Sequence, residues 1–431
     1  MLYTYYGDDF TGSTDVLEQL GSNGIPSVLF VGIPSPDHAA RFAGVQAIGI
    51  AGDSRTRSPE WMAENLPAVY RALQQFRAPV NHYKVCSTFD SSPTHGNIAR
   101  AIHIGAEVFC PEFIPIIVGA PHLRRYVAFG NLFAAAPDGS IQRIDRHPMS
   151  RHPVTPMHEA DLRHHLAAQG LHNIDLIDIP ALESRKAAHL LDTYLAERPC
   201  PPVLFDTVNN AGRAVVGDLI WSRAQQRPLF AAGSSGLTAA LVDTWRKAGL
   251  IPGPLPASTL PYAGPLLVVS GSCSMATERQ LRYAMEHGYV TIALDPADLI
   301  NGVRGVRQHA IDDAMRALSS GRDTILYTAL GTPAAPAHGD RLGIALGTLL
   351  RELLQRSATH AAPIGRLVVC GGDTSSHAVQ QLGIHALTWA ANIAPGGPLC
   401  RAHSDGPLDG MEVVLKGGQV GGADFFDLVR G

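Results

Sequence analysis

The chain carries no excess of basic charge and contains little lysine. Its formal net charge is −4, and only four of its 34 basic residues are lysines, at positions 84, 186, 247 and 416. Domains that bind nucleic acid usually present a basic surface, so the composition argues against a nucleic-acid partner. Because lysine is rare in this chain, a lysine inside a strand-like segment is a candidate functional residue.

Paired cysteines and long apolar runs are also missing. The six cysteines, at positions 86, 110, 200, 273, 370 and 400, show neither a C-x-x-C pair nor the Cys/His spacing of a zinc site. We expect reduced thiols in a cytoplasmic protein. The first residues lack the basic and apolar regions of a signal peptide. No apolar stretch reaches the roughly 18 residues of a membrane span, so no membrane partner is expected.

What the chain does contain is a regular alternation of short apolar runs and amphipathic stretches. Its 431 residues predict two or three domains at roughly 150 residues each. The alternation is typical of βαβ units and a parallel sheet, with helices expected over 59–77 and 181–197, among others. Strands are expected near 2–6, 27–31, 46–50, 81–86, 115–119, 173–178, 202–206, 228–232, 266–270, 289–293, 323–327, 366–370 and 411–415.

The domain boundary is expected in the stretch 248–265, which contains five prolines. This predicts a first domain over 1–247, a linker over 248–265 and a second domain over 266–431. The fold class is therefore α/β, with two domains that are each a largely parallel sheet flanked by helices, and with a ligand cleft between them. The stretch 144–162, rich in His, Arg and Pro, is predicted to be a long surface loop or arm.

Polar residues gather where strands of the first domain end, which is where open parallel sheets bind ligands. Asp8 and Asp9 follow the first strand and could take a proton from a hydroxyl or hold a metal, although a helix cap would explain one of them. Arg55, in the loop 54–57, could bind a carboxylate, and is favoured over Arg57.

Two further loops of the first domain have the same character. Lys84 lies inside a strand-like run, and several hydroxyls and an acid follow it in one loop. This would suit a polyhydroxylated ligand, although a helix cap before Pro93 is the alternative. The turn 233–236 could present backbone N–H groups and hydroxyls to an anion, or be only a tight turn. The candidate substrate-binding residues are Arg55, Lys84, Ser87, Thr88, Asp90, Ser234 and Ser235.

The second domain has small residues at its strand ends. Its first strand ends in a serine-rich turn, and Lys416 leads into a glycine-rich loop. The stretch 371–376 is the strongest phosphate-type signal, because glycines admit a close ligand and a helix N-terminus favours negative charge. It matches neither a Walker A loop nor a dinucleotide fingerprint. The candidate cofactor-binding residues are Ser272, Ser274, Gly371, Gly372, Asp373, Thr374, Gly417 and Gly418, with Asp373 also expected to reach Mg²⁺.

Together these stretches resemble the four-carbon acid-sugar kinase family over nearly the whole chain. The likeness rests on the order of GDDFTGSTD, KVCSTFDSS, GSSGL, SGSCS, GGDTSSHAVQQLGI, IAPGGPL and LKGGQVGGADFF. The resemblance implies two α/β domains, the first holding a short sugar acid and the second holding ATP with Mg²⁺. It implies that Asp8, Asp9, Arg55 and Lys84 face the sugar acid, and that the serine and glycine turns of the second domain bind nucleotide.

One departure from the family pattern bears on the substrate. Many relatives follow the Ser-Thr pair with Leu-Arg-Gly-Asn, whereas this chain has Phe89-Asp90-Ser91-Ser92. Replacing an arginine by an acid near the substrate would change which sugar fits. The resemblance therefore implies a subgroup that acts on a branched or oxo sugar acid, such as 3-oxo-isoapionate, rather than on threonate or erythronate.

The sequence thus predicts a kinase that transfers the γ-phosphoryl group of ATP to a hydroxyl of a small sugar acid, with Asp8 or Asp9 as the base. It does not choose between these two acids, and it leaves a homo-oligomer open. The alternative hypothesis is a metal-dependent sugar-acid lyase or dehydratase that uses no nucleotide. A third hypothesis is a non-catalytic sugar-acid sensor. The glycine-rich turns argue against the lyase, because such chemistry needs no polyphosphate pocket.

Overall fold

The computed structural model describes residues 1–136, 138–151, 155–256, 260–331, 339–359 and 364–431. The chain forms two compact units. The first unit comprises Met1–Asp8, Asn23–Ser27 and Gly44–Pro254, and the second comprises Asp9–Ser22, Val28–Ala43 and Leu255–Gly431. No helix among the described residues is long and apolar enough to cross a membrane.

A seven-stranded parallel sheet forms the centre of the first unit. Its strand order is β3-β1-β4-β11-β5-β10-β9, and every neighbouring pair is parallel. The strands are β1 (Tyr3–Gly7), β3 (Ala47–Ala51), β4 (Val80–Lys84), β5 (Ile114–Ile117), β9 (Asp175–Ile177), β10 (Pro202–Phe205) and β11 (Leu229–Gly233). Every residue of β1, β3, β4 and β11 is buried, as expected for strands covered on both faces.

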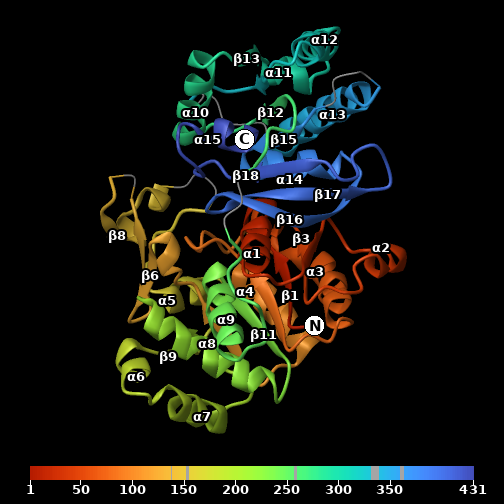
Figure 1. The fold of residues 1–431 in the computed structure, drawn as a ribbon. Helices are drawn as coiled ribbons and strands as arrows, with labels where there is room; N and C mark the ends of the chain where they lie inside the picture. Colours follow the sequence, from red (N-terminus) through yellow and green to blue (C-terminus); the bar gives the residue numbers. More distant parts are fainter. Residues whose placement is uncertain (137, 152–154, 257–259, 332–338, 360–363) are drawn as a thin grey trace. The chain divides into compact units, whose positions relative to one another are not determined.

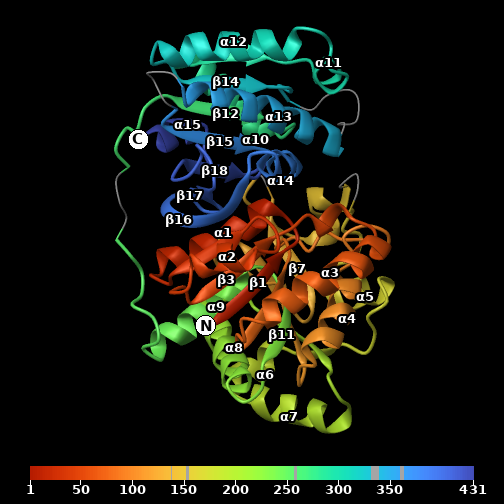
Figure 2. The ribbon, with the colours of Figure 1, turned by 90° about the vertical axis from the view of Figure 1, so that its right-hand side faces the viewer.

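Helices cover both faces of this sheet. Figure 2 shows α3 (Pro59–Gln74) and α4 (Ile98–Phe109) on one side of β1 and β11, with α8 (Asn210–Ala224) and α9 (Ser235–Lys247) on the other. The sequence of α3 explains its place. Ser58 accepts a hydrogen bond from the N–H of Trp61, Pro59 occupies the first turn, and the buried Met62, Leu66, Tyr70 and Leu73 recur at helical spacing.

The first unit also contains a small antiparallel sheet that the alternation of apolar runs did not predict. It consists of β6 (Arg125–Ala128), β7 (Asn131–Ala135) and β8 (Ile141–Arg143). The expectation of a surface arm over 144–162 is wrong for part of its length. His147, Thr155, Met157 and Ala160 are buried. The N–H of Leu132 donates to Ala160 O at 2.9 Å, which ties the segment to β7.

A mixed sheet forms the centre of the second unit. Strands β13 (Val290–Ala293), β14 (Thr324–Tyr327), β12 (Leu266–Ser270), β15 (Arg366–Cys370) and β18 (Glu412–Lys416) are parallel neighbours in that order. The antiparallel strands β17 (Gly397–Ser404) and β16 (Ile384–Ala394), visible in Figure 1, continue the sheet. The predicted strands near 266–270, 289–293, 323–327, 366–370 and 411–415 are confirmed, whereas the hairpin over 384–404 was not predicted.

Two N-terminal segments belong to the second unit. Helix α1 (Phe10–Ser22) packs on β16, β17, β18 and α14 (Gly372–Gln380). Strand β2 (Ser27–Phe30) pairs with β16, Leu29 opposite Leu387 and Phe30 opposite Ala386. The expected division placed both segments in the first domain, because each predicted domain was one continuous stretch of the chain. The other boundary, after Pro254, lies inside the proline-rich stretch 248–265.

The remaining helices surround these sheets. The predicted helix over 181–197 is two helices, α6 (Ile179–Glu183) and α7 (Ala187–Glu197), because the chain leaves the helical path at Arg185, whose φ is +58°. The other helices are α2 (Pro36–Ala40), α5 (Leu162–Ala168), α10 (Met275–Glu286), α11 (Pro296–Ile300), α12 (Val306–Ser319), α13 (Gly339–Ser357) and α15 (Phe425–Arg430). The predicted α/β class with largely parallel sheets is confirmed.

Candidate functional site

The strand ends of the first unit bring Asp8, Arg55 and Lys84 together. Strands β3, β1 and β4 are parallel neighbours, so their carboxyl ends share one edge of the sheet. The N–H of Asp8 donates to Lys84 O at 2.9 Å, and the N–H of Arg55 donates to Asp8 O at 3.1 Å. Lys84 is buried, with 2% of its surface exposed, so a cation lies inside this edge.

Arg55 forms a two-point ion pair with Asp8. Its Nε donates to Asp8 Oδ2 at 3.0 Å and its Nη2 to Asp8 Oδ1 at 2.8 Å. The side chain of Asp8 is almost fully buried, and a paired arrangement of this kind is the strongest contact an arginine makes with a carboxylate. The sequence assigned the Arg55 guanidinium to the substrate, but here a carboxylate of the same chain occupies its fork.

Asp9 has different surroundings, within the second unit. Its Oδ1 accepts from the N–H of Gly12 at 2.8 Å and its Oδ2 accepts from the Thr11 hydroxyl at 2.8 Å, so it caps α1. A β-carbon at Gly372 would lie 3.9 Å from Asp9 Oδ2. The capping alternative therefore has support for Asp9, and the same carboxylate also lies beside the glycine turn that precedes α14.

The loop after β4 is held by its own side chains. The Thr88 hydroxyl donates to Asp90 Oδ1 at 2.5 Å, and both residues are buried. Ser91 Oγ lies 2.8 Å from His165 Nε2 on α5, and Gln169 Nε2 donates to Ser91 Oγ at 2.8 Å. Burial lowers the pKa of His165 to about 4, so the ring is neutral at pH 7. Ser87 is half-buried at the start of this loop.

The two serines after β11 differ in their contacts. Ser234 caps α9, because its Oγ accepts from the N–H of Gly236 at 3.0 Å and donates to Val118 O at 2.7 Å. Ser235 is 1% exposed, and its Oγ has no hydrogen-bond partner among the described residues. A buried hydroxyl without a partner is costly in a folded protein, so Ser235 is the better candidate for contact with a ligand.

In the second unit, three turns meet at the carboxyl ends of the neighbouring parallel strands β12, β15 and β18. Ser274 caps α10, accepting from the N–H of Thr277 at 3.1 Å, and its hydroxyl donates to Gly418 O. Ser272 Oγ lies 3.3 Å from Ser274 Oγ. A β-carbon at Gly418 would lie 3.2 Å from the Ser274 Cβ, which is tighter than most real Cβ contacts, so the glycine favours the close approach of these two turns.

The turn after β15 connects to the same group. Gly371 has a φ of +111°, and its N–H donates to Lys416 O at 2.9 Å. Helices α10 and α14 both begin at this edge of the sheet, and their N-terminal N–H groups and dipoles favour an anion. Asp373 and Thr374 lie in α14, but their side chains are outside the described residues, so their expected roles remain predictions.

Lys416 is a residue of this site that the candidate set did not include. It is fully buried, and its Nζ donates to Thr277 Oγ1 at 3.1 Å and to Gly417 O at 3.0 Å. Burial lowers the pKa of its ammonium group. The rarity of lysine was the signal that could have found it. Its charge lies where the three turns converge.

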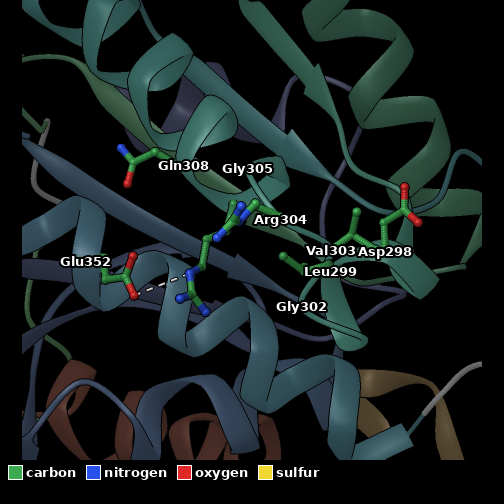
Figure 3. Close-up of a pocket in the computed structure, with 9 residues that line it drawn as sticks. Asp298, Leu299, Gly302, Val303, Arg304, Gly305, Gln308 and Glu352 are labelled. Carbon is green, nitrogen blue, oxygen red and sulfur yellow. Dashed lines mark ion pairs between the residues drawn. The ribbon is translucent and has the colours of Figure 1, made fainter.

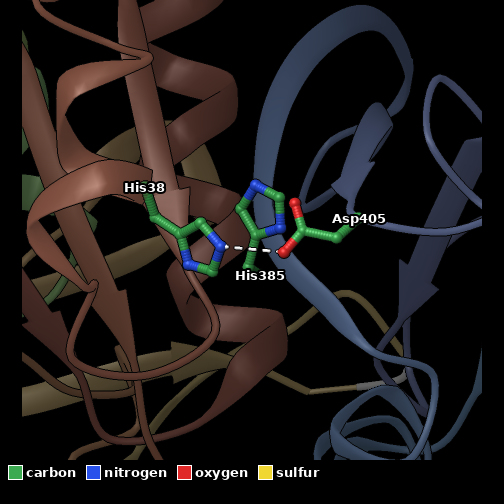
Figure 4. Close-up of side chains that lie close together, drawn as sticks. All are labelled: His38, His385 and Asp405. Atoms are coloured by element: carbon green, nitrogen blue, oxygen red, sulfur yellow. Dashed lines mark hydrogen bonds and ion pairs between the residues drawn. The ribbon is translucent and has the colours of Figure 1, made fainter.

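Two other features of the second unit do not include the candidate residues. A cavity of about 230 Å³ is lined by residues of α11, α12 and α13 and of the loop 302–305, and Glu352 is labelled at its wall in Figure 3. Glu352 forms an ion pair with Arg307. His38, His385 and Asp405 lie close together in Figure 4. The two rings stack at 4.0 Å and are 8° from parallel, and Arg41 pairs with Asp405 at 2.8 Å. A metal must lie in the plane of each ring, so this geometry favours a stacked ion-pair contact.

Comparison with known proteins agrees with this division of chemistry. A family model described as a sugar-binding N-terminal domain matches residues 3–241, and one described as a nucleotide-binding C-terminal domain matches residues 267–426. The chain belongs to the four-carbon acid-sugar kinase family. The expectation drawn from its sequence motifs is therefore confirmed, and its first unit carries most of the sugar-binding model.

Individual relatives sharpen the comparison. A protein of Paraburkholderia graminis named 3-oxo-isoapionate kinase is 43% identical, covering 100% of this chain and 94% of the relative. A Cupriavidus necator protein named 3-oxo-tetronate kinase is 31% identical, covering 97% and 94%. A solved Salmonella typhimurium structure aligns with a TM-score of 0.79 at 25% identity over 100% and 98% of the two chains. A Haemophilus influenzae structure aligns with a TM-score of 0.73 at 24% identity over 99% of each chain, which shows the fold.

Proposed function

We propose that this protein transfers the γ-phosphoryl group of ATP to a hydroxyl of a branched oxo sugar acid of the 3-oxo-isoapionate type. The observation that carries the choice of substrate is the difference in identity. The chain is 43% identical to the relative named for 3-oxo-isoapionate and 31% identical to one named for 3-oxo-tetronate, with nearly full coverage in both cases. Asp90, which stands where many family members have another residue, is buried in the loop after β4.

The residues of the second unit suit a nucleotide. Phosphoryl transfer depends mainly on positioning and on neutralising charge. The turns at Gly371, Gly372, Gly417 and Gly418 would give phosphates access to backbone N–H groups, and the Lys416 ammonium would add a positive charge. Carboxylate oxygens are the ligands that Mg²⁺ takes from proteins. Asp373, which follows Gly372 in the chain, has the right chemistry to hold the ion, which would neutralise phosphate charge when bound.

The two acids would have separate roles. Both oxygens of Asp8 accept hydrogen bonds from Arg55, which fixes this carboxylate at the strand end. Asp9 lies beside the glycine turn after β15, so we assign to it the removal of the proton from the attacking hydroxyl. Asp8, Arg55 and Lys84 would then position the sugar acid, with Ser87, Thr88, Asp90 and Ser235 near its hydroxyl and oxo groups.

The decisive experiment measures ADP release with Mg-ATP and a panel of acids: threonate, erythronate, their 3-oxo forms and 3-oxo-isoapionate. We expect turnover with 3-oxo-isoapionate to exceed turnover with every four-carbon acid. A higher rate on a 3-oxo-tetronate would contradict the substrate assignment and leave the kinase intact. ATP at about 100 times its Kd should stabilise the fold by roughly 2.7 kcal/mol. Absence of both turnover and stabilisation would contradict the kinase itself and favour the nucleotide-independent lyase.

A further inference from the structure

Buried polar atoms without partners cluster around one turn of the first unit. Among the described residues, nine buried side-chain nitrogen or oxygen atoms have no hydrogen-bond partner. Three of these nine belong to residues around the turn 118–120, which follows β5: Arg125 Nε, Thr207 Oγ1 and Ser235 Oγ. Buried polar groups in folded proteins nearly always have partners, so three such atoms around one turn require an explanation.

Backbone contacts place all three residues at this turn. The N–H of Ala120 donates to Arg125 O at 2.9 Å, and the N–H of Arg125 donates back to Ala120 O at 3.2 Å. A β-carbon at Gly119 would lie 2.7 Å from the Thr207 Cβ. Ser234, next to Ser235, donates to Val118 O at 2.7 Å. The carboxyl ends of the neighbouring strands β5, β10 and β11 therefore place Thr207 and Ser235 beside the turn to which the backbone of Arg125 is bonded.

Among the described residues, no carboxylate balances the charge of Arg125. Its Nη1 donates only to the backbone oxygens of Leu123 and Arg124, at 3.1 and 3.2 Å. No carboxylate among the described residues forms an ion pair with it. Burial lowers the pKa of its guanidinium, and the only group acting in the opposite direction is the thiol of Cys86. A partly buried cation without an anion is expensive, and it is typical of sites that bind an anionic ligand.

Cys86 connects this cation to the candidate site. It lies two residues beyond Lys84 in the loop after β4, and both Arg125 and Arg55 are within electrostatic range of its thiol. Strand β11 lies between β4 and β5, and Ser235 follows it. Arg125 thus lies within electrostatic range of the loop after β4, which also carries residues assigned to the sugar acid. The sequence did not single out Arg125, because the small sheet that carries it was not predicted.

We propose that Arg125, together with the hydroxyls of Ser235 and Thr207, forms the subsite that binds the carboxylate of the sugar acid. This rests on the proposed function, since the sugar acid is its substrate. Arg55 was the expected carboxylate ligand, but its fork is occupied by Asp8. Arg125 has a donor that no described residue uses. A carboxylate there would supply the missing counter-charge and accept hydrogen bonds from the two hydroxyls.

The test measures binding of 3-oxo-isoapionate by calorimetry without nucleotide, alongside the kinase assay. Arg125→Gln should weaken sugar-acid binding at least 10-fold and raise the KM for the sugar acid by a similar factor, with the KM for ATP within 2-fold of wild type. Arg125→Lys should recover part of the loss. The matched control is Arg124→Lys, at an exposed neighbour that donates to Gly139 O, and it should leave both KM values unchanged.

A second variant keeps the inference testable if Arg125→Gln does not fold. Ser235→Ala removes a buried hydroxyl that has no partner, so the melting temperature should be kept or raised, while sugar-acid binding should weaken several-fold. The neutral amide of the same acid serves as a second probe. Wild type should bind the amide more weakly than the acid, whereas Arg125→Gln should bind the two ligands equally well. Equal acid binding by wild type and both variants would overturn the subsite, whether or not turnover is observed. Wild type that binds no acid would overturn it as well.

Discussion

The two units would bind their proposed ligands with different parts of the chain. In the first unit the strands end in charged and hydroxyl side chains, such as Asp8, Arg55 and Lys84, and several of these are already bonded to one another. In the second unit the strands end in glycine and serine turns that expose the backbone, with one buried lysine. Side chains can discriminate among sugar acids, whereas backbone N–H groups and helix N-termini fit any polyphosphate.

This contrast predicts which substitutions affect which ligand. Changes among the side chains of the first unit should alter the choice and affinity of the sugar acid. Changes in the turns of the second unit should alter ATP affinity alone. Variants that affect both ligands equally would show that the division is wrong.

The largest effect is expected for Asp9→Asn. The change removes the proposed base and should lower kcat by about 100-fold or more. Asn caps a helix as well as Asp does, so the contacts to Gly12 and the melting temperature should be nearly kept. The measurement is steady-state kinetics with thermal unfolding. The opposite result would be a larger loss of kcat in Asp8→Asn than in Asp9→Asn, together with a smaller rise in the KM for the sugar acid. In that case the roles assigned to the two acids must be exchanged.

Gly418→Ala tests whether the turns of the second unit bind the nucleotide. The new methyl group would lie 3.2 Å from the Ser274 Cβ and 3.4 Å from Ser272 Oγ, so the two turns must separate. We expect the KM for ATP to rise about 10-fold, a typical cost of a small misplacement, with the KM for the sugar acid within 2-fold. The control is Gly406→Ala, since a β-carbon at Gly406 would meet nothing within 4 Å. A rise in the sugar-acid KM alone would refute the assignment.

Arg55→Lys tests the ion pair of the first unit. Lysine keeps the positive charge but cannot make the two-point contact with Asp8. The KM for the sugar acid should rise by roughly 5- to 10-fold, because the fixed carboxylate at the strand end becomes mobile, and the KM for ATP should not change. Arg57→Lys is the matched control, because Arg57 pairs with Asp53. Equal effects at both positions would indicate a general role of the loop.

The smallest effect concerns stability, at Glu18 in the second unit. Its carboxylate accepts from the N–H of Gly396 at 2.8 Å, and burial, with a contribution from Asp15, raises its pKa to about 8. In the unfolded chain the pKa lies near 4.5. The folded state therefore holds the proton more tightly between these values, and stability should fall as pH rises from about 5 to 8.

Glu18→Gln should remove this slope. The amide oxygen can still accept from Gly396, and we expect a gain on the order of 1–3 kcal/mol in the free energy of unfolding at pH 8, with little change at pH 5. Chemical denaturation at both pH values measures it. Glu352→Gln, at a surface ion pair with Arg307, serves as control. A parallel pH dependence in wild type and Glu18→Gln would show that another group is responsible.

Much of the fold followed from local patterns. Apolar runs such as 47–51 and 367–370 form strands because both of their faces are buried. The hairpin over 384–404 was missed because its mixed run IHALTWAANIA shows no clear alternation, although Pro395 and Gly396 form the turn between its strands. The small sheet over 125–143 was missed because its strands are short and half-buried, and it carries Arg125.

The sequence by itself determined the α/β class, the family and the loops that hold candidate residues, because strand ends and glycine turns are marked by local composition. Only the tertiary structure decided how those residues are used. Asp8 and Asp9 are adjacent in the chain, yet one is fixed by Arg55 and the other caps α1 beside Gly372. Whether Arg55 is bonded and whether Arg125 lacks a counter-charge depend on contacts across strands that are far apart in sequence, and no local pattern records such contacts.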